Sequence, residues 1–210
     1  MSPVSSRQQS EITRQKILDA AHSLFLEQGY HATSMRQIGG RAGVTMGGIY
    51  NHFSSKEEIW VAIFTQRHPV LLAAPILNQV EGKTTAEVVR SAARLMVEEL
   101  DRRTESVNLM LIEIIEFNAR HTSLLVESAL PVFVELGDLL QQQPQELRDI
   151  PLPTLLRSFL GLFFSYYMTR RLVPQEVLPI FGDESLDLFV DIYLHGILRQ
   201  GAPDEEVEDA

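Results

Sequence analysis

Apolar residues recur along most of the chain at the spacings of three and four that give an α-helix one buried face. The first such stretch predicts a helix over residues 11–28, which Gly29 ends. Its apolar face consists of Ile12, Ile17, Ala20, Ala21, Leu24 and Phe25. Residues 1–10 are polar and lack this period, so we expect them to be disordered.

Residues 33–56, TSMRQIGGRAGVTMGGIYNHFSSK, predict two short helices joined by a tight turn. Gly43 allows the positive φ of such a turn, and Thr45 is a residue type that caps a second helix. The apolar positions that would face inward are Met35, Ile38, Ala42, Ile49 and Phe53. Together these features form the helix-turn-helix pattern, whose second helix enters the major groove of DNA.

An ordinary helical hairpin is the alternative interpretation of these residues. Two features favour DNA binding instead. The outward positions of the second helix offer small and hydrogen-bonding groups and no acidic side chain, and they are Met46, Gly47, Gly48, Tyr50, Asn51 and His52. The first helix adds the cations Arg36 and Arg41, which could approach phosphates or bases.

The rest of the chain also predicts helices, and no strand alternation interrupts them, so the expected fold class is all-α. These helices are expected over residues 55–68, 84–100, 105–120, 123–143, 153–171 and 184–200. We therefore expect a helix-turn-helix domain of three helices over residues 11–56 and a second, helical domain over 57–200. The acidic tail, residues 201–210, is expected to be disordered.

Charge is divided unevenly between these two predicted domains. The net charge is −10, yet residues 1–56 hold six basic and three acidic side chains, which gives +3 and leaves −13 for the remainder. A basic head on an acidic body would orient the protein on DNA. The chain has no cysteine, which excludes disulfides, thiolate metal sites and cysteine nucleophiles.

The N-terminal sequence lacks the apolar core of a signal peptide, and the longest apolar run, residues 159–168, is far shorter than the ~20 residues of a membrane helix. We therefore expect a cytoplasmic protein without membrane spans. Nothing in the sequence indicates an enzyme, because the six histidines show no metal-ligand spacing and no phosphate-binding glycine loop follows a strand. No metal or cofactor is expected.

Residues 11–60 resemble the N-terminal domain of the tetracycline-repressor (TetR) family. The resemblance is carried by Ile17-Leu18-x-Ala20-Ala21-x-x-Leu24-Phe25-x-x-x-Gly29-Tyr30-x-x-Thr33-Ser34 and by Arg36-Gln37-Ile38-x-x-x-Ala42-Gly43-Val44-Thr45-x-Gly47-x-Ile49-Tyr50-x-His52-Phe53-x-x-Lys56-Glu57-Glu58-Ile59. Gly39 and Gly40 depart from the pattern, since the family usually has alanine at the first. Each glycine would weaken the helix by ~1 kcal/mol relative to alanine.

The resemblance implies a ligand-responsive transcriptional regulator, most often a repressor, which binds a palindromic operator as a homodimer. In that role Arg36 would contact guanine, Met46 and Gly48 would face the bases, and Gly47 would let the backbone approach them. The positions that match phosphate contacts are Thr33, Thr45, Tyr50, His52 and Lys56. The rival hypothesis is a helical protein–protein adaptor that does not bind specific DNA sequences.

The resemblance also implies that the second domain binds a small apolar or amphipathic effector. Candidate ligand-binding residues are Phe64, Met96, Met110, Glu113, Phe117, His121, Phe133, Phe163 and Tyr167. Such aromatic and methionine positions more often form plain core. Glu113 lies within an apolar run and lacks a partner four residues on, so it either awaits a ligand or faces water. Glu116, in contrast, has Arg120 at that spacing.

The last two predicted helices are apolar around nearly their whole circumference, which requires burial on all sides. They are either internal core helices or also pack against a second copy of the chain. The resemblance implies the second alternative, with a dimer interface formed by Leu156, Phe159, Phe163, Phe189, Ile192, Tyr193 and Ile197.

Overall fold

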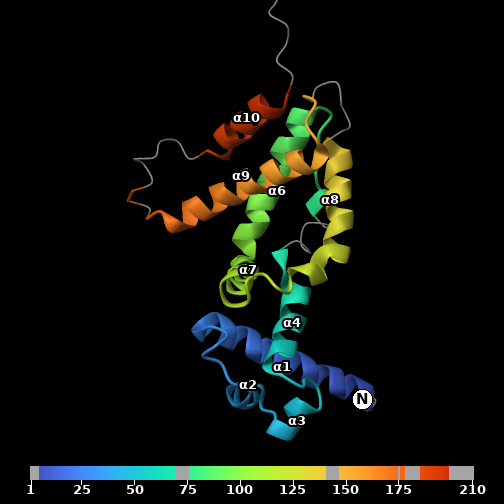
Figure 1. Ribbon diagram of the computed structural model, residues 1–210, viewed down its shortest axis with the longest axis vertical. Helices are drawn as coiled ribbons and strands as arrows, with labels where there is room; N and C mark the ends of the chain where they lie inside the picture. The colour runs from blue at the N-terminus through green and yellow to red at the C-terminus, as the bar shows by residue number, and fades with distance from the viewer. Residues whose placement is uncertain (1–4, 70–75, 141–146, 175, 178–184, 199–210) are drawn as a thin grey trace, which may run out of the picture. The chain divides into compact units, whose positions relative to one another are not determined.

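A computed structural model of the chain describes residues 5–69, 76–140, 147–174, 176–177 and 185–198 (Figure 1). Over these ranges the regular elements are helices, and an isolated bridge between Leu147 and Leu198 is the one pairing of extended segments. The predicted all-α fold is confirmed. Among the described helices, none combines the length and the hydropathy that a membrane span requires.

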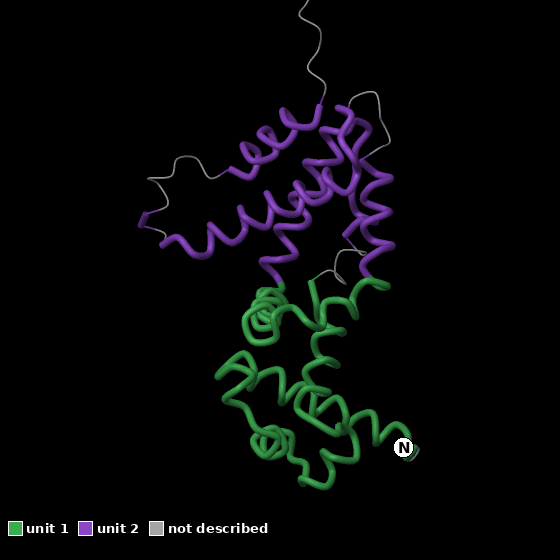
Figure 2. Tube along the Cα trace, viewed as in Figure 1, with its two compact units in different colours: residues 1–71, 103–128 green, residues 72–102, 129–210 purple. Residues whose placement is uncertain are grey.

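The chain forms two compact units (Figure 2). Unit 1 consists of residues 1–71 and 103–128, and unit 2 consists of residues 72–102 and 129–210. The predicted DNA-binding helices lie in unit 1, which also includes two helices that the sequence assigned to the second domain, α4 (Lys56–Arg67) and α7 (Thr104–Phe117).

Unit 1 begins with α1 (Ser6–Gln28), which starts five residues before the position that the sequence predicted. The expectation of disorder up to residue 10 is therefore wrong for residues 6–10. Ser5 and Gln8 form a capping box, in which each side chain binds the other residue's backbone N–H. Because this exchange satisfies two donors that the helix start leaves open, a polar segment can still begin a helix.

Two short helices, α2 (Met35–Ala42) and α3 (Met46–Tyr50), lie together on one side of α1 (Figure 1). Thr45 caps the start of α3 as predicted, and a capping box of Ser34 and Gln37 caps the start of α2. Gly43 has the left-handed backbone that the turn requires, with φ of 67°. The core of unit 1 joins these helices to α4 and α7 through Phe25, Ile38, Ile49, Trp60 and Leu109, among others.

Unit 2 contains α6 (Thr85–Arg102), most of α8 (Val126–Leu140), α9 (Leu152–Leu172) and α10 (Leu186–Ile197). Its core includes Val89, Phe159, Phe163 and Val190. The buried hydroxyl of Tyr193 donates a 2.8 Å hydrogen bond to the Leu155 carbonyl, which ties α10 to α9. The predicted loop before α9 is described from residue 147, and the acidic tail lies outside the described residues.

Candidate DNA-binding interface

Gly39, which departs from the family pattern, lets α2 pack closely against α3 and the turn between them. A Cβ added at Gly39 would lie 2.9 Å from Ile49 Cδ1 and 3.0 Å from the Val44 carbonyl oxygen. The space that alanine would need is therefore occupied by the turn and by the buried side chain of α3. At Gly40 nothing lies within 4 Å of such a Cβ, so this second glycine has no packing requirement.

Most of the predicted DNA-contacting residues of α2 and α3 are exposed. Arg36 is exposed and has no hydrogen bond or ion pair with another described residue, so its guanidinium is available to a ligand. Met46 and Tyr50 are 39% and 54% exposed, which is high for apolar side chains. The remaining positions of this set are Thr45, Gly47 and Asn51, which are exposed, and Gly48 and His52, which are half-buried.

The two glycines of α3 differ in what they permit. A Cβ at Gly48 would lie 2.6 Å from Val44 Cγ1, a short branched side chain that fills the turn, so glycine is needed there for packing. A Cβ at Gly47 would meet nothing within 4 Å. Gly47 is thus the position of α3 at which the backbone is open to an approaching molecule.

Two of the predicted phosphate contacts, Thr33 and Lys56, make hydrogen bonds inside the protein. Thr33 is 2% exposed, and its hydroxyl donates a 2.8 Å hydrogen bond to the Gly29 carbonyl. Lys56 Nζ donates hydrogen bonds to the carbonyl oxygens of Tyr30 (2.6 Å) and Thr33 (2.7 Å) and lies 4.0 Å from the centre of the Tyr30 ring. Burial lowers the pKa of this ammonium.

Other cations of unit 1 are also paired within the protein. The Arg41 guanidinium binds both carboxylate oxygens of Glu27, at 2.6 and 2.8 Å, and Arg14 lies 5.0 Å from the centre of the Phe53 ring. Arg41 therefore does not offer the free cation that its position in the sequence indicated. Among the described residues of the first two helices, Arg7, Lys16 and Arg36 remain exposed and unpaired.

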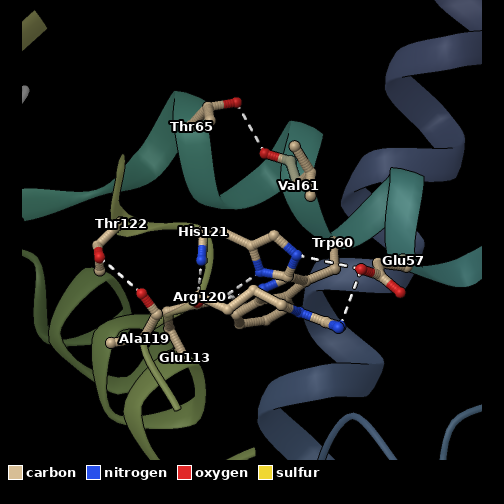
Figure 3. Close-up of polar contacts among 9 residues, drawn as sticks. All are labelled: Glu57, Trp60, Val61, Thr65, Glu113, Ala119, Arg120, His121 and Thr122. Atoms are coloured by element: carbon tan, nitrogen blue, oxygen red, sulfur yellow. Dashed lines mark hydrogen bonds and ion pairs between the residues drawn. The ribbon is translucent and has the colours of Figure 1, made fainter. Parts of the chain in front are cut away.

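Both interpretations of Glu113 are wrong, because it neither faces water nor lacks a partner (Figure 3). Its carboxylate is fully buried and accepts hydrogen bonds from Trp60 Nε1 (2.7 Å) and the His121 backbone N–H (2.8 Å). The His121 ring continues the network, with Nδ1 at 3.0 Å from Glu113 and Nε2 at 3.2 Å from Glu57. Arg120 pairs with Glu57 rather than with Glu116, so the predicted Glu116–Arg120 pair is also wrong.

The nine predicted ligand-binding residues are divided between the two units. Unit 1 holds Phe64, Met110, Glu113, Phe117 and His121, and unit 2 holds Met96, Phe133, Phe163 and Tyr167. Phe64 and Phe117 stack on Trp60, with ring centres 6.1 and 5.2 Å away, so they are part of the unit 1 core. Tyr167 is fully buried, and its hydroxyl has no hydrogen-bond partner among the described residues.

Most of the residues predicted to form the dimer interface do not lie on the surface of the chain. Leu156, Phe159, Phe163, Tyr193 and Ile197 are buried within unit 2, and Phe189 is half-buried. Ile192, in contrast, is 64% exposed, and Leu188 one turn earlier is 46% exposed. Periodicity alone could not separate these groups, because an apolar residue has the same pattern in a core as in an interface.

Comparison with known proteins agrees with this geometry. Residues 17–63 match the model of the bacterial regulatory proteins of the tetR family. The HTH-type transcriptional regulator SrpR of Pseudomonas putida is 43% identical over 65 residues, a match that spans 30% of this chain and only 30% of SrpR. The likeness to SrpR is therefore limited to these 65 residues.

Solved structures match over nearly the whole chain and show its fold. A tetR family transcription regulator from Shewanella sp. PV-4 has a TM-score of 0.66 at 17% identity, covering 90% of this chain and 99% of that one. NalD of Pseudomonas aeruginosa, the secondary repressor of the MexAB-OprM multidrug efflux pump, has a TM-score of 0.61 at 24% identity, covering 92% and 99%.

Proposed function

We propose that this chain is a DNA-binding transcriptional regulator of the tetR family, and that it acts as a homodimeric repressor that a small molecule releases from its operator. The observation that carries the proposal is the exposed surface of α2 and α3, where Arg36 is unpaired and residues 33–53 contain no acidic side chain. The adaptor hypothesis is not favoured by the family match. Such a regulator would act in the cytoplasm and would need no catalytic residue.

Each exposed residue of this surface has a role that its chemistry supports. Arg36 would donate two hydrogen bonds to guanine O6 and N7, and Met46 would contact bases through its apolar side chain. Gly47 would allow the backbone of α3 to approach the base edges. Thr45, Tyr50, Asn51 and His52 would bind phosphates, which positions the protein without reading sequence. With so few long side chains on α3, part of the specificity would come from DNA shape.

Dimerisation through α9 and α10 is supported by the exposed apolar pair Leu188 and Ile192 on α10. Two copies would then place their recognition helices about one helical turn apart, ~34–36 Å, on a palindromic operator. The role as a repressor is supported by the likeness in fold to NalD, which is a repressor. An amphipathic effector is supported by the buried hydroxyl of Tyr167, which lacks a hydrogen-bond partner among the described residues and which a polar group of such a molecule could satisfy.

The test is selection of the purified full-length protein on a pool of random duplex DNA, followed by a salt titration. Enrichment of an inverted repeat is the expected result. Binding that weakens with salt but enriches no sequence would leave only phosphate contacts and would overturn the proposal of a specific operator. Arg36→Ala should then lower affinity for the selected site more than for random DNA. Equal losses on both would remove Arg36 as a base contact.

A further inference from the structure

The connection between α1 and α2, residues 29–33, is held by side chains from two other helices. From α4, Lys56 donates hydrogen bonds to its carbonyl oxygens at Tyr30 and Thr33. From α7, the Glu116 carboxylate accepts hydrogen bonds from the backbone N–H groups of Tyr30 (3.3 Å) and His31 (3.2 Å). A cation thus binds the backbone carbonyls of this short segment, and an anion binds its backbone N–H groups.

The position of the Glu116 carboxylate depends on the glycine at the start of this connection. Gly29 has a φ of 83°, in the left-handed region that side chains rarely adopt, and a Cβ there would lie 3.3 Å from Glu116 Oε1. The side chain of Glu116 is only 18% exposed. Since hydrogen bonds to a charged, partly buried group are stronger than those to a neutral one, the carboxylate is a firm attachment point.

The connection leads directly into the helix that carries the predicted base contact. Its last residue, Thr33, precedes Ser34, the N-cap of α2, and Arg36 follows two residues later. One turn before Glu116, α7 also holds Glu113, which accepts the hydrogen bond of Trp60 from α4. A displacement of α7 must therefore either move both contacts or break them.

We propose that Glu116 is a positioning residue for DNA recognition, which holds the α1–α2 connection in the conformation that presents Arg36 to DNA. Through it, the position of α7 is transmitted to α2 directly and not only by way of α4. This inference rests on the proposed function and adds to it a residue outside the DNA-binding surface that affects DNA binding. The residues that carry it lie 85 positions apart in sequence, within unit 1.

Operator affinity of the full-length Glu116→Gln variant tests this inference. The amide oxygen can accept one of the two N–H groups, while the amide nitrogen cannot accept the other, so we expect about a tenfold loss of affinity for the selected operator. The change in net charge alone would instead raise the affinity, because removing an anion favours DNA binding. Unchanged or higher affinity would overturn the proposal.

The matched control is Asp19→Asn. It also removes a carboxylate that ties two helices of unit 1, since Asp19 binds Arg67 at 2.6 Å, but it does not touch the α1–α2 connection. We expect this variant to keep or gain affinity. Both variants are compared well below their melting temperatures, so that a loss of affinity cannot come from unfolded protein.

Amide hydrogen exchange in the wild-type protein gives a second test that needs no variant. If DNA binding and the Glu116 contacts are coupled, the operator must slow exchange at the N–H groups of Tyr30 and His31, because coupling is reciprocal. Equal exchange at both amides with and without operator would overturn the inference. A wild-type protein that selects no operator would instead overturn the proposed function, so the two failures are distinguishable.

Discussion

The indole N–H of Trp60 donates a 2.7 Å hydrogen bond to the buried Glu113 carboxylate, 53 residues further along the chain. Two consecutive residues with left-handed backbone, Asn118 and Ala119, turn the chain after α7 so that the His121 N–H reaches the same carboxylate. Such backbone costs free energy outside glycine, so the turn persists only because the surrounding contacts fix it. Glu113 is therefore a structural centre of unit 1.

Glu113→Ala should lower the free energy of unfolding by about 3 kcal/mol or more, because Trp60 and the His121 amide would lose their acceptor in a dry environment. Glu113→Gln should cost less, about 1–2 kcal/mol, since the amide oxygen can still accept one of them. Urea unfolding followed by Trp60 fluorescence measures both. As a control, Glu105→Gln on the same helix, where the side chain is 71% exposed, should change stability by less than about 0.5 kcal/mol.

Lys56→Met should destabilise the protein and leave the salt dependence of DNA binding unchanged. Loss of the ammonium removes a donor from the carbonyls of Tyr30 and Thr33, which we expect to cost about 1–2 kcal/mol. A phosphate contact would instead reduce the slope of log affinity against log salt by about one. A reduced slope with unchanged stability would restore the phosphate role that the sequence indicated.

The local features of this fold could be predicted from the sequence because neighbouring residues determine them. Ser34 and Thr45 cap α2 and α3, and Gly43 makes the turn, all as their residue types indicated. The periodic apolar positions Ile38 and Ile49 are buried as expected. Such features depend on residues only a few positions apart, so no partner distant in sequence has to be known.

The polar contacts of unit 1 could not be predicted because their partners are distant in sequence. Lys56 and Tyr30 are 26 positions apart, and Glu116 and His31 are 85 apart. Periodicity shows which face of a helix is apolar, but not which charged group a polar side chain on that face will meet. Glu113 thus resembled either an empty ligand site or a surface residue, and is neither.

Acidification should destabilise the protein through His68. Burial is the main cause that lowers the pKa of His68 to about 4, from a reference of 6.5, and Glu113 opposes the shift. The folded state favours the neutral ring, so the unfolded chain binds the proton more readily. The stability that His68 contributes is present above pH 6.5 and is lost as the pH falls toward 4.

The measurement is urea unfolding of wild type and His68→Gln at about pH 7.5 and about pH 5.5, where carboxylates remain ionised. Allowing for partial exposure of the ring, we expect wild type to lose about 1 kcal/mol more than the variant between these values. Some loss should remain in the variant, because burial and Arg67 also lower the pKa of His22. Equal losses in both proteins would contradict the assignment to His68.

Alanine substitutions at the glycines of α2 and α3 should distinguish a role in packing from a role in DNA contact. Gly48→Ala should cost about 1–3 kcal/mol of stability, because its Cβ would lie 2.6 Å from Val44 Cγ1 and the stiff valine must move. Gly47→Ala meets no neighbour within 4 Å, so stability should hold or rise by up to about 1 kcal/mol through helix propensity. If the backbone of α3 approaches the bases at Gly47, however, the added methyl group should lower operator affinity by about tenfold.

Gly40→Ala is the matched control, because it also meets nothing within 4 Å but lies on α2. It should raise the free energy of unfolding by up to about 1 kcal/mol through helix propensity and leave operator affinity unchanged. Chemical unfolding and fluorescence anisotropy on the selected operator, measured for all three variants, give the comparison. Operator affinity of Gly47→Ala equal to that of Gly40→Ala would mean that α3 does not bring its backbone close to DNA at this position. Sequence reading would then depend on Arg36, Met46 and DNA shape alone.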